Sequence, residues 1–220
     1  MGSAVLIRDP YNLIITGVGG QGNVTASRLV ASMLVEKGFV VTVGETFGAS
    51  QRGGSVMSHV RVSSRQTYSP QIPKGTADLV VSLEPSEALR VAASYGGPRT
   101  ICLSNDRPVF PVRVIAGEVA YPRVDEIRSS LESLCAAVIM IPATVRAVAL
   151  GKAVLQNVVM VGALAGLGVL PFTRDDFEGL IARDMPEDGA ALNMKAFDAG
   201  ADLVRGFVTT DMWDEGEKLG

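Results

Sequence analysis

Four glycines lie among residues 17–22, in the order Gly-Val-Gly-Gly-Gln-Gly. The apolar run of residues 12–16 precedes them and apolar residues at helical spacing follow, so we expect a turn between a strand and a helix. In such a turn the first glycine permits a tight bend, the second lets an anion approach the main chain, and the third lets helix and strand pack closely. Unpaired N–H groups at the start of the helix would stabilise a phosphate or a carboxylate. The candidate binding residues of this turn are Gly17, Gly19, Gly20, Gln21 and Gly22.

The same motif has two other interpretations. In a dinucleotide-binding protein, an acidic residue at the end of the next strand hydrogen-bonds the ribose. Glu45 follows Gly22 at about the required separation and would fill that role. This predicts a free-standing NAD(P)- or FAD-binding protein. The other interpretation is a glycine-rich junction that packs tightly and binds nothing.

A second glycine pair follows an arginine in the segment FGASQRGGS, residues 47–55. We expect a loop between two strands here, where a simple βαβ unit would have a crossover helix. Arg52 carries a planar guanidinium with five donors, and the glycines let the main chain bend around an anion. The alternative is a flexible loop tip with a solvated arginine. The candidate binding residues of this loop are Ser50, Gln51, Arg52, Gly53 and Gly54.

Composition limits the chemistry that the chain can perform alone. Its formal net charge is −3, so there is no basic excess and we expect no nucleic-acid partner. It has two cysteines, Cys102 and Cys135, and one histidine, His59. These residues cannot supply the ligands of a four-cysteine iron–sulfur cluster or of an ordinary structural zinc, so we expect no bound metal. Both cysteines lie in apolar runs and are interpreted as core residues. We find no signal-peptide pattern and expect a cytoplasmic protein.

Hydrophobic patterning predicts the elements that must position the two loops. Strands are expected at residues 12–17, 39–46, 56–63, 78–83, 99–104 and 137–141. Helices are expected at residues 22–37, 85–95, 123–134, 142–150, 153–168, 173–183 and 189–206. For the proline-rich residues 105–122 we expect a loop with room for one edge strand.

This order of elements predicts an α/β fold with a Rossmann-like, mostly parallel sheet flanked by helices, and an all-helical C-terminal third. We expect a single domain, with an α/β core over about residues 11–150 and a helical part over about 151–207.

Residues 153–170 form the most membrane-like stretch, but Gln156 and Asn157 lie within it. We interpret it as a helix covered by protein on most sides and expect no membrane association. Gly162 and Gly166 would share one face of this helix and permit close packing against a neighbour. The acidic C-terminal tail is expected to fray.

Taken together, these segments resemble the γ-type domain of the 2-oxoacid:acceptor oxidoreductases. Within that family they are most similar to the small β subunits of indolepyruvate:ferredoxin oxidoreductases. The resemblance covers roughly residues 11–207 and is carried by GVGGQGNVTASRLVA (17–31), GETFGASQRGGSVMSHVR (44–61), SPQIPKGTADLVVSLEPSEALR (69–90) and NVVMVGALAG (157–166), and by the spacing of Asn193, Ala196, Phe197 and Gly200.

The resemblance implies oxidative decarboxylation of an aryl 2-oxoacid such as indolepyruvate, coupled to coenzyme A, with electrons passed to ferredoxin. It implies that a larger partner subunit carries thiamine diphosphate, Mg and [4Fe-4S] clusters. This chain would then hold no catalytic residue and would be inactive alone. The sequence supports this division, because it lacks cluster ligands and its nearest match to an acidic thiamine signature, Glu187-Asp188-Gly189, has Asn193 too close behind it.

We expect the two glycine loops to converge at the carboxyl ends of the strands, where open α/β sheets bind ligands. There they would bind the substrate carboxylate or a coenzyme A phosphate, or they would close the thiamine pocket and exclude water. Asn157 and Asn193 are possible further site residues, although a polar residue in an apolar helix is more often a structural hydrogen-bonding group. A last interpretation is a non-enzymatic assembly protein whose loops only contact a partner.

Overall fold

The computed structural model describes residues 6–47 and 54–207 of the chain. Four residues of the second glycine loop, Ser50, Gln51, Arg52 and Gly53, lie outside the described residues, as does the acidic tail.

The described chain forms one six-stranded sheet in the order β2-β3-β1-β4-β5-β6. The strands are β1 (Tyr11–Val18), β2 (Val40–Phe47), β3 (Ser55–Ser63), β4 (Leu79–Ser82), β5 (Ile101–Asn105) and β6 (Ala137–Ile141). The pairings of β1 with β4, β4 with β5 and β5 with β6 are parallel. The prediction of a mostly parallel sheet in an α/β fold is therefore confirmed.

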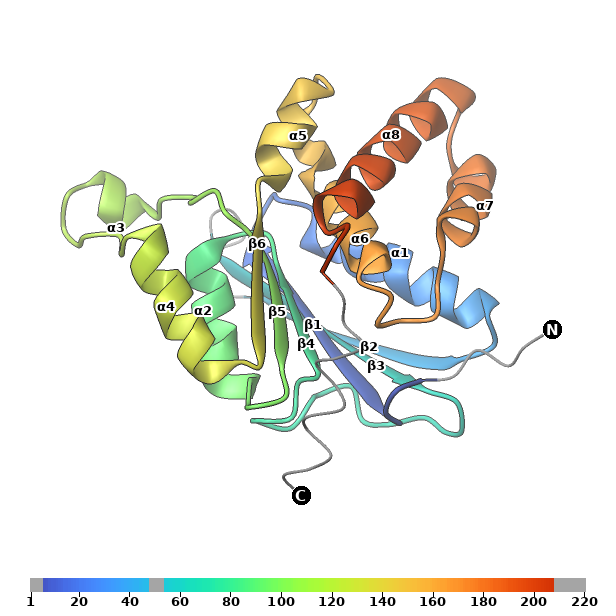
Figure 1. Ribbon diagram of the computed structural model, residues 1–220, viewed down its shortest axis with the longest axis horizontal. Coiled ribbons are helices and arrows are strands. Elements are labelled where there is room, and N and C mark those ends of the chain that lie inside the picture. The colour runs from blue at the N-terminus through green and yellow to red at the C-terminus, as the bar shows by residue number, and fades with distance from the viewer. Residues whose placement is uncertain (1–5, 48–53, 208–220) are drawn as a thin grey trace.

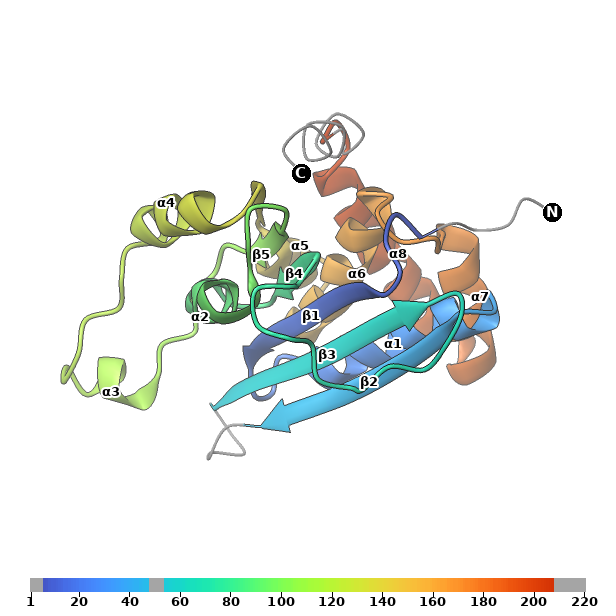
Figure 2. The ribbon, with the colours of Figure 1, turned by 90° about the horizontal axis from the view of Figure 1, so that it is seen from below.

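Strand β3 departs from the simple Rossmann pattern, because it runs antiparallel to both of its neighbours and separates β2 from β1. The connection between β2 and β3 contains the second glycine pair and is too short to hold a crossover helix, so the two strands pair as an antiparallel ribbon. Figure 2 shows this ribbon, with β3 lying between β2 and β1.

Helices cover both faces of the sheet. They are α1 (Asn23–Glu36), α2 (Pro85–Tyr95), α3 (Val112–Ile115), α4 (Val124–Leu134), α5 (Ala143–Ala149), the 3₁₀ turn η1 (Ala153–Leu155), α6 (Gln156–Gly166), α7 (Arg174–Asp184) and α8 (Glu187–Leu203). Helices α2 and α4 lie on one face, and α1, α6, α7 and α8 lie on the other (Figure 1). The helical C-terminal third is confirmed.

Two hydrophobic cores follow from the alternation of side chains along each strand. In β1, Leu13 and Ile15 point into the core that the sheet shares with α1, α6 and α8. Ile14 points to the opposite face, into the core shared with α2 and α4. All three are buried, as expected for a central strand of a sheet with helices on both faces.

Helices α6 and α8 pack unusually closely, and glycines permit it. A Cβ atom added at Gly162 would lie 1.9 Å from the main-chain oxygen of Phe197, and one added at Gly200 would lie 1.9 Å from that of Val159. A Cβ at Gly166 would lie 2.6 Å from Val204. The close packing predicted for the face of Gly162 and Gly166 is confirmed. None of the helices in the described part of the chain is long and apolar enough to cross a membrane.

Two local predictions need correction. Residues 106–123, the β5–α4 connection, contain the short helix α3 and no strand, because β6 pairs with β5 and takes the edge position. The helix predicted at residues 189–206 begins earlier, at Glu187. Pro186 fits the residue that precedes a helix, and Glu187 and Asp188 complement the dipole of its first turn.

Candidate functional site

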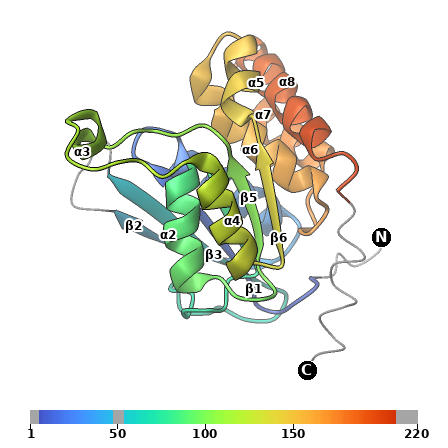
Figure 3. The same cartoon turned by 60° about the vertical axis from the view of Figure 1, so that its left-hand side comes forward.

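The candidate site lies at the carboxyl ends of the parallel strands. The chain leaves β1 for α1 on one face of the sheet and leaves β4 for α2 on the opposite face (Figure 1). Figure 3 shows α2 beside α4 on that second face. Because β1 and β4 are neighbours, their connections diverge and open a crevice between them. Open α/β sheets bind their ligands at such switch points.

Gln21 fills the centre of the first glycine turn with its own side chain. The main-chain N–H of Val18 donates to Gln21 Oε1 over 2.7 Å, and Gln21 Nε2 donates to the main-chain oxygen of Leu83 over 2.9 Å. A Cβ atom at Gly17 would lie 2.8 Å from Gln21 Oε1 and 2.5 Å from Asn23 Oδ1. The first glycine therefore makes room for amide side chains of the turn itself.

The third glycine packs against a helix that the motif alone does not predict. Gly22 has a φ of +88°, and a Cβ atom there would lie 2.4 Å from Asn157 Nδ2 in the first turn of α6. The sequence predicted that this glycine lets helix and strand pack closely, and the atoms nearest to its Cβ position are those of Asn157. Asn157 is thereby brought to the turn.

The two glycine segments meet at their described ends. The N–H of Gly19 donates to the main-chain oxygen of Gly54 over 2.8 Å. That N–H is therefore used within the protein, whereas Gly20 is exposed and has no neighbouring atom within 4 Å of an added Cβ. Helix α1 begins at Asn23 with no capping side chain, so the turn has an open side at Gly20 and uncapped N–H groups in the first turn of the helix.

A chain of buried amides and a hydroxyl crosses the carboxyl ends of β4, β5 and β6. Asn105 Nδ2 donates to the main-chain oxygen of Leu83 and to Thr144 Oγ1. The N–H of Thr144 donates to Asn105 Oδ1, which fixes the orientation of that amide. Thr144 Oγ1 in turn donates to Gln156 Oε1 over 2.6 Å. Leu83 also accepts from Gln21, so the chain joins the glycine turn to α6.

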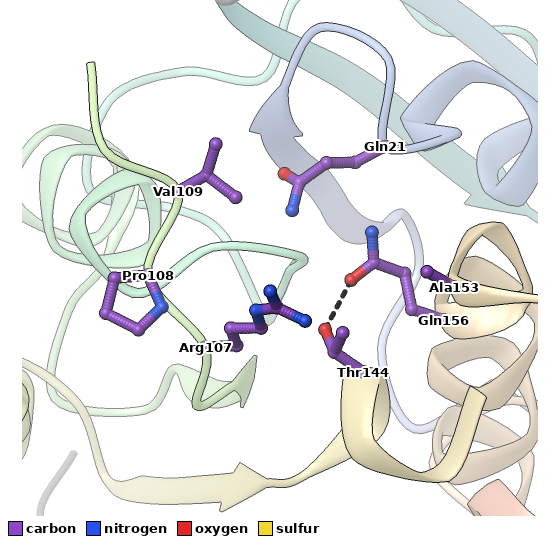
Figure 4. A pocket seen from close by; sticks show the side chains of 7 residues that line it. All are labelled: Gln21, Arg107, Pro108, Val109, Thr144, Ala153 and Gln156. Carbon is purple, nitrogen blue, oxygen red and sulfur yellow. Dashed lines mark hydrogen bonds between the residues drawn. The ribbon is translucent and has the colours of Figure 1, made fainter. Parts of the chain in front are cut away.

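A cavity of about 310 Å³ lies against this chain of hydrogen bonds. It is lined by Gln21, Arg107, Pro108, Val109, Thr144, Ala153 and Gln156. Figure 4 shows the side chains of Gln21, Arg107 and Gln156 converging on the cavity from three elements. They come from the glycine turn, from the segment after β5 and from the start of α6.

The cavity presents hydrogen-bond donors. The side-chain oxygens of Gln21 and Gln156 both accept hydrogen bonds from the protein. One N–H of the Gln21 amide donates to Leu83, so its second N–H and the amide N–H groups of Gln156 are the donors left for a ligand. Arg107 adds a guanidinium, which has donors and no acceptor. In the described part of the chain, no ion pair ties Arg107 to a carboxylate. Such a cavity suits a carboxylate or a phosphate.

The structure does not bring every predicted residue to this cavity. Glu45 is exposed on β2, and β3 separates β2 from β1. Glu45 is therefore not on either of the two strands, β1 and β4, that border the crevice. Asn193 donates to the main-chain oxygen of Gly189 and to the sulfur of Met185, within its own helix and the preceding turn. The arrangement thus favours the anion interpretation over the dinucleotide one.

Sequence reasoning missed Arg107, Asn105, Thr144 and Gln156 as site residues. A usable signal existed, because Asn105 ends β5, Arg107 follows two residues later, and Thr144 follows the end of β6. Polar residues at the carboxyl ends of successive parallel strands gather at one edge of the sheet.

The two cysteines are core residues, as predicted. Both are free and buried. Burial raises the pKa of the Cys102 thiol, and it raises that of Cys135 to about 11, so both stay protonated near neutral pH. In the described part of the chain, no three His, Cys, Asp or Glu residues gather as metal ligands.

A family model described as pyruvate ferredoxin/flavodoxin oxidoreductase matches residues 12–203. The chain belongs to this family. The match includes the glycine turn, the described end of the second loop and every residue that lines the cavity.

Two curated relatives have similar sequences over most of their length. Indolepyruvate oxidoreductase subunit IorB of Archaeoglobus fulgidus is 39% identical over 189 residues, which cover 86% of this chain and 92% of the relative. Subunit IorB of Pyrococcus horikoshii is 37% identical over 196 residues, which cover 89% of this chain and 96% of the relative. The similarity therefore covers nearly the whole length of both relatives.

The fold is also shared with a solved structure. Pyruvate oxidoreductase subunit PORC of Thermotoga maritima superposes with a TM-score of 0.66 at 19% sequence identity. The superposition covers 89% of this chain and 97% of that subunit. The α/β sheet and the helical third therefore form a fold that this chain shares with that subunit.

Proposed function

We propose that this chain is a subunit of a 2-oxoacid:ferredoxin oxidoreductase that acts on an aryl 2-oxoacid, with indolepyruvate as the first candidate. The names of its curated relatives, at 37–39% identity over most of both chains, carry this proposal. The chain acts as a single γ-type domain in the cytoplasm. It has no activity without its partner.

The proposal assigns the reactive groups to a larger partner subunit. Thiamine diphosphate with Mg, together with [4Fe-4S] clusters, supplies decarboxylation and electron transfer to ferredoxin there. The composition supports this assignment, because two buried cysteines cannot provide the four thiolates of a cluster. Coenzyme A is the acceptor of the acyl group in the assembled complex.

The role of this chain in the reaction is to bind an anion at the carboxyl edge of its sheet. Arg107 supplies charge, and the oriented amides of Gln21 and Gln156 supply further donors. The anion is the carboxylate of the 2-oxoacid or a phosphate of coenzyme A. Arg52, in the loop that ends at Gly54, is proposed to add a second guanidinium, because Gly54 is hydrogen-bonded to the first glycine turn.

Reconstitution tests the assignment. The chain is mixed with its partner subunit, and reduction of ferredoxin or a viologen dye is followed with indolepyruvate and coenzyme A. We expect turnover from the mixture and none from either subunit alone. Calorimetry with NAD, NADP and FAD on the isolated chain should give no heat of binding. Tight dinucleotide binding, together with an inactive mixture, would favour the dinucleotide interpretation.

Substitution of Arg107 tests the anion site within the complex. A hydrogen bond to a charged group contributes about 1.5–3 kcal/mol, so Arg107→Ala should raise one KM by roughly 10- to 100-fold. The substrate whose KM rises identifies the anion. Arg128→Ala is the matched control, because it removes an equal charge from an exposed site on α4. Unchanged KM values for both substrates in Arg107→Ala and Arg52→Ala would favour the assembly role.

A further inference from the structure

Glu84 is a fully buried carboxylate at the start of α2, with 0% of its surface exposed. It is the N-cap residue of that helix and begins the Glu-Pro-Ser-Glu-Ala-Leu-Arg run noted in the sequence. A buried carboxylate is costly unless hydrogen bonds satisfy it. The donors to Glu84 are two main-chain N–H groups and two hydroxyls, and they divide between its two oxygens.

One oxygen of Glu84 caps α2. Glu84 Oε2 accepts from the N–H of Glu87 over 2.8 Å and from Ser86 Oγ over 2.6 Å. This pattern is an ordinary helix cap, which satisfies an N–H group that has no partner within the helix.

The other oxygen holds the β5–α4 connection. Glu84 Oε1 accepts from the N–H of Val109 over 3.4 Å and from the hydroxyl of Tyr121. Burial raises the pKa of Tyr121, and the acceptor Glu84 raises it further, so the phenol stays protonated and donates. A single oxygen atom thus binds the connection near its beginning and near its end.

The attachment at Val109 lies next to the cavity. Val109 lines the cavity together with Arg107 and Pro108, on the same short segment. The connection forms no strand pairing and carries α3 away from the sheet (Figure 1, Figure 2). Its arc from Val109 to Tyr121 is closed at its base by Glu84 and by contact between the rings of Phe110 and Tyr121, with centroids 5.2 Å apart.

We propose that Glu84 is a positioning residue, whose Oε1 atom fixes Val109 and with it the Arg107 wall of the cavity. The consequence for affinity rests on the proposed function, because it requires the cavity to bind an anion during the reaction. The hydrogen-bonding role does not depend on that function. Arg107 is exposed and its side chain is long, so a fixed main chain lowers the entropy that is lost when the guanidinium binds its ligand.

Tyr121→Phe tests the proposal, because it removes a donor to Oε1 and keeps both hydrogen bonds to Oε2. It also removes the hydroxyl that accepts from the N–H of Ser86 over 3.3 Å, in the first turn of α2. Ser86→Ala is the matched control, because it removes a hydroxyl donor from Oε2 of the same carboxylate. Hydrogen exchange is measured on the full chain by NMR. We expect faster exchange of the Val109 amide in Tyr121→Phe, by roughly three- to tenfold, and no change there in Ser86→Ala. Equal exchange at Val109 in both variants and the unmodified chain would overturn the proposal.

Kinetics in the reconstituted complex test the consequence. Tyr121→Phe should raise the KM that depends on Arg107 by roughly three- to tenfold, with kcat changed less than about twofold. In an Arg107→Ala background, Tyr121→Phe should have no further effect on that KM, because both changes act on one contact. An equal rise in both backgrounds would overturn the positioning role. Arg107→Ala with unchanged KM values would instead contradict the proposed function, and the exchange experiment would still decide the role of Glu84.

Discussion

Asn157 joins the helical third of the chain to the first glycine turn, with its Nδ2 atom 3.5 Å from the main-chain oxygen of Gly22. Its own Oδ1 accepts from the N–H of Val158, so the side chain also satisfies the first turn of α6. The residues of this contact are far apart in sequence, yet both lie beside the cavity residues Gln21 and Gln156. This contact therefore fixes the position of the glycine turn relative to α6, and both elements line the candidate site.

A double-mutant cycle should show this coupling. Gly22 has a left-handed φ of +88°, which costs about 1–2 kcal/mol in a residue with a Cβ. In Gly22→Ala the new Cβ would also clash with Asn157. Asn157→Ala should cost about 1 kcal/mol for a lost hydrogen bond. The double variant should be more stable than the sum of the two costs predicts, because Asn157→Ala removes the clash. Urea unfolding measures each free energy, and strict additivity would show that the two residues do not interact.

Gly17 and Gly20 should respond differently to alanine. Gly17→Ala places a Cβ against Gln21, Asn23 and Leu83, so we expect about 1–3 kcal/mol of lost stability together with displacement of Gln21. Gly20→Ala has open space around it and should cost only the strain of its φ of +99°, about 1–2 kcal/mol. In the reconstituted complex, Gly17→Ala should therefore raise a KM at temperatures where both variants are folded. If Gly20→Ala raised that KM more strongly, the anion would lie at the exposed turn and not at Gln21.

The contact of α6 with α8 should tolerate no added methyl group. In Gly200→Ala the new Cβ would overlap main-chain atoms of Val159 and Ala163, which cannot rotate away. We expect a loss of about 3 kcal/mol or more of unfolding free energy. Gly179→Ala, in α7, is the matched control: nothing lies within 4 Å of its Cβ position, and removing a helical glycine should stabilise the chain by about 0.5–1 kcal/mol. Thermal unfolding of the two variants gives the comparison, and equal midpoints would contradict it.

The alternation of elements was predictable from sequence because hydrophobic period and helix caps are local properties. The expected bounds of α2, residues 85–95, agree with the structure, since Pro85 and the cap at Glu84 mark its beginning. The position of β3 between β1 and β2 was not predicted, because pairing order is set by contacts between distant residues. The one indication in the sequence was the short, glycine-containing segment before β3, which is too short for a crossover helix.

The candidate site was only partly predictable for the same reason. The glycine motif located the turn, but it did not show that Gln21 and Asn157 occupy the space that the glycines leave. Arg107 has no motif around it, and its place in the cavity wall follows from the end of β5 lying beside the ends of β4 and β6. The polar residues after β5 and β6 can be read from the sequence, but the strand order is needed to show that these strand ends lie side by side.

The single histidine should make stability depend on pH. His59 is 3% exposed, and its Nδ1 accepts from the N–H of Ile72 over 3.3 Å. Burial lowers the pKa of His59, and the charge of Arg61 lowers it further. The folded state therefore holds the neutral ring, whereas the unfolded chain binds a proton at about pH 6.5. Between the lowered pKa and about 6.5 the unfolded state binds more protons, so the free energy of unfolding falls as the pH is lowered through this range.

His59→Asn is the variant that isolates this effect, because Asn Oδ1 can accept from Ile72 in place of Nδ1 and does not titrate. The free energy of unfolding is measured by urea denaturation at about pH 7.5 and about pH 5.5 for both proteins. We expect the difference between the unmodified chain and His59→Asn to shrink at the lower pH, by at most about 1.4 kcal/mol per pH unit. Carboxylates contribute equally to both proteins and cancel in this difference. A difference that stays constant would show that His59 has the same pKa folded and unfolded, and that its ring is not held neutral by burial.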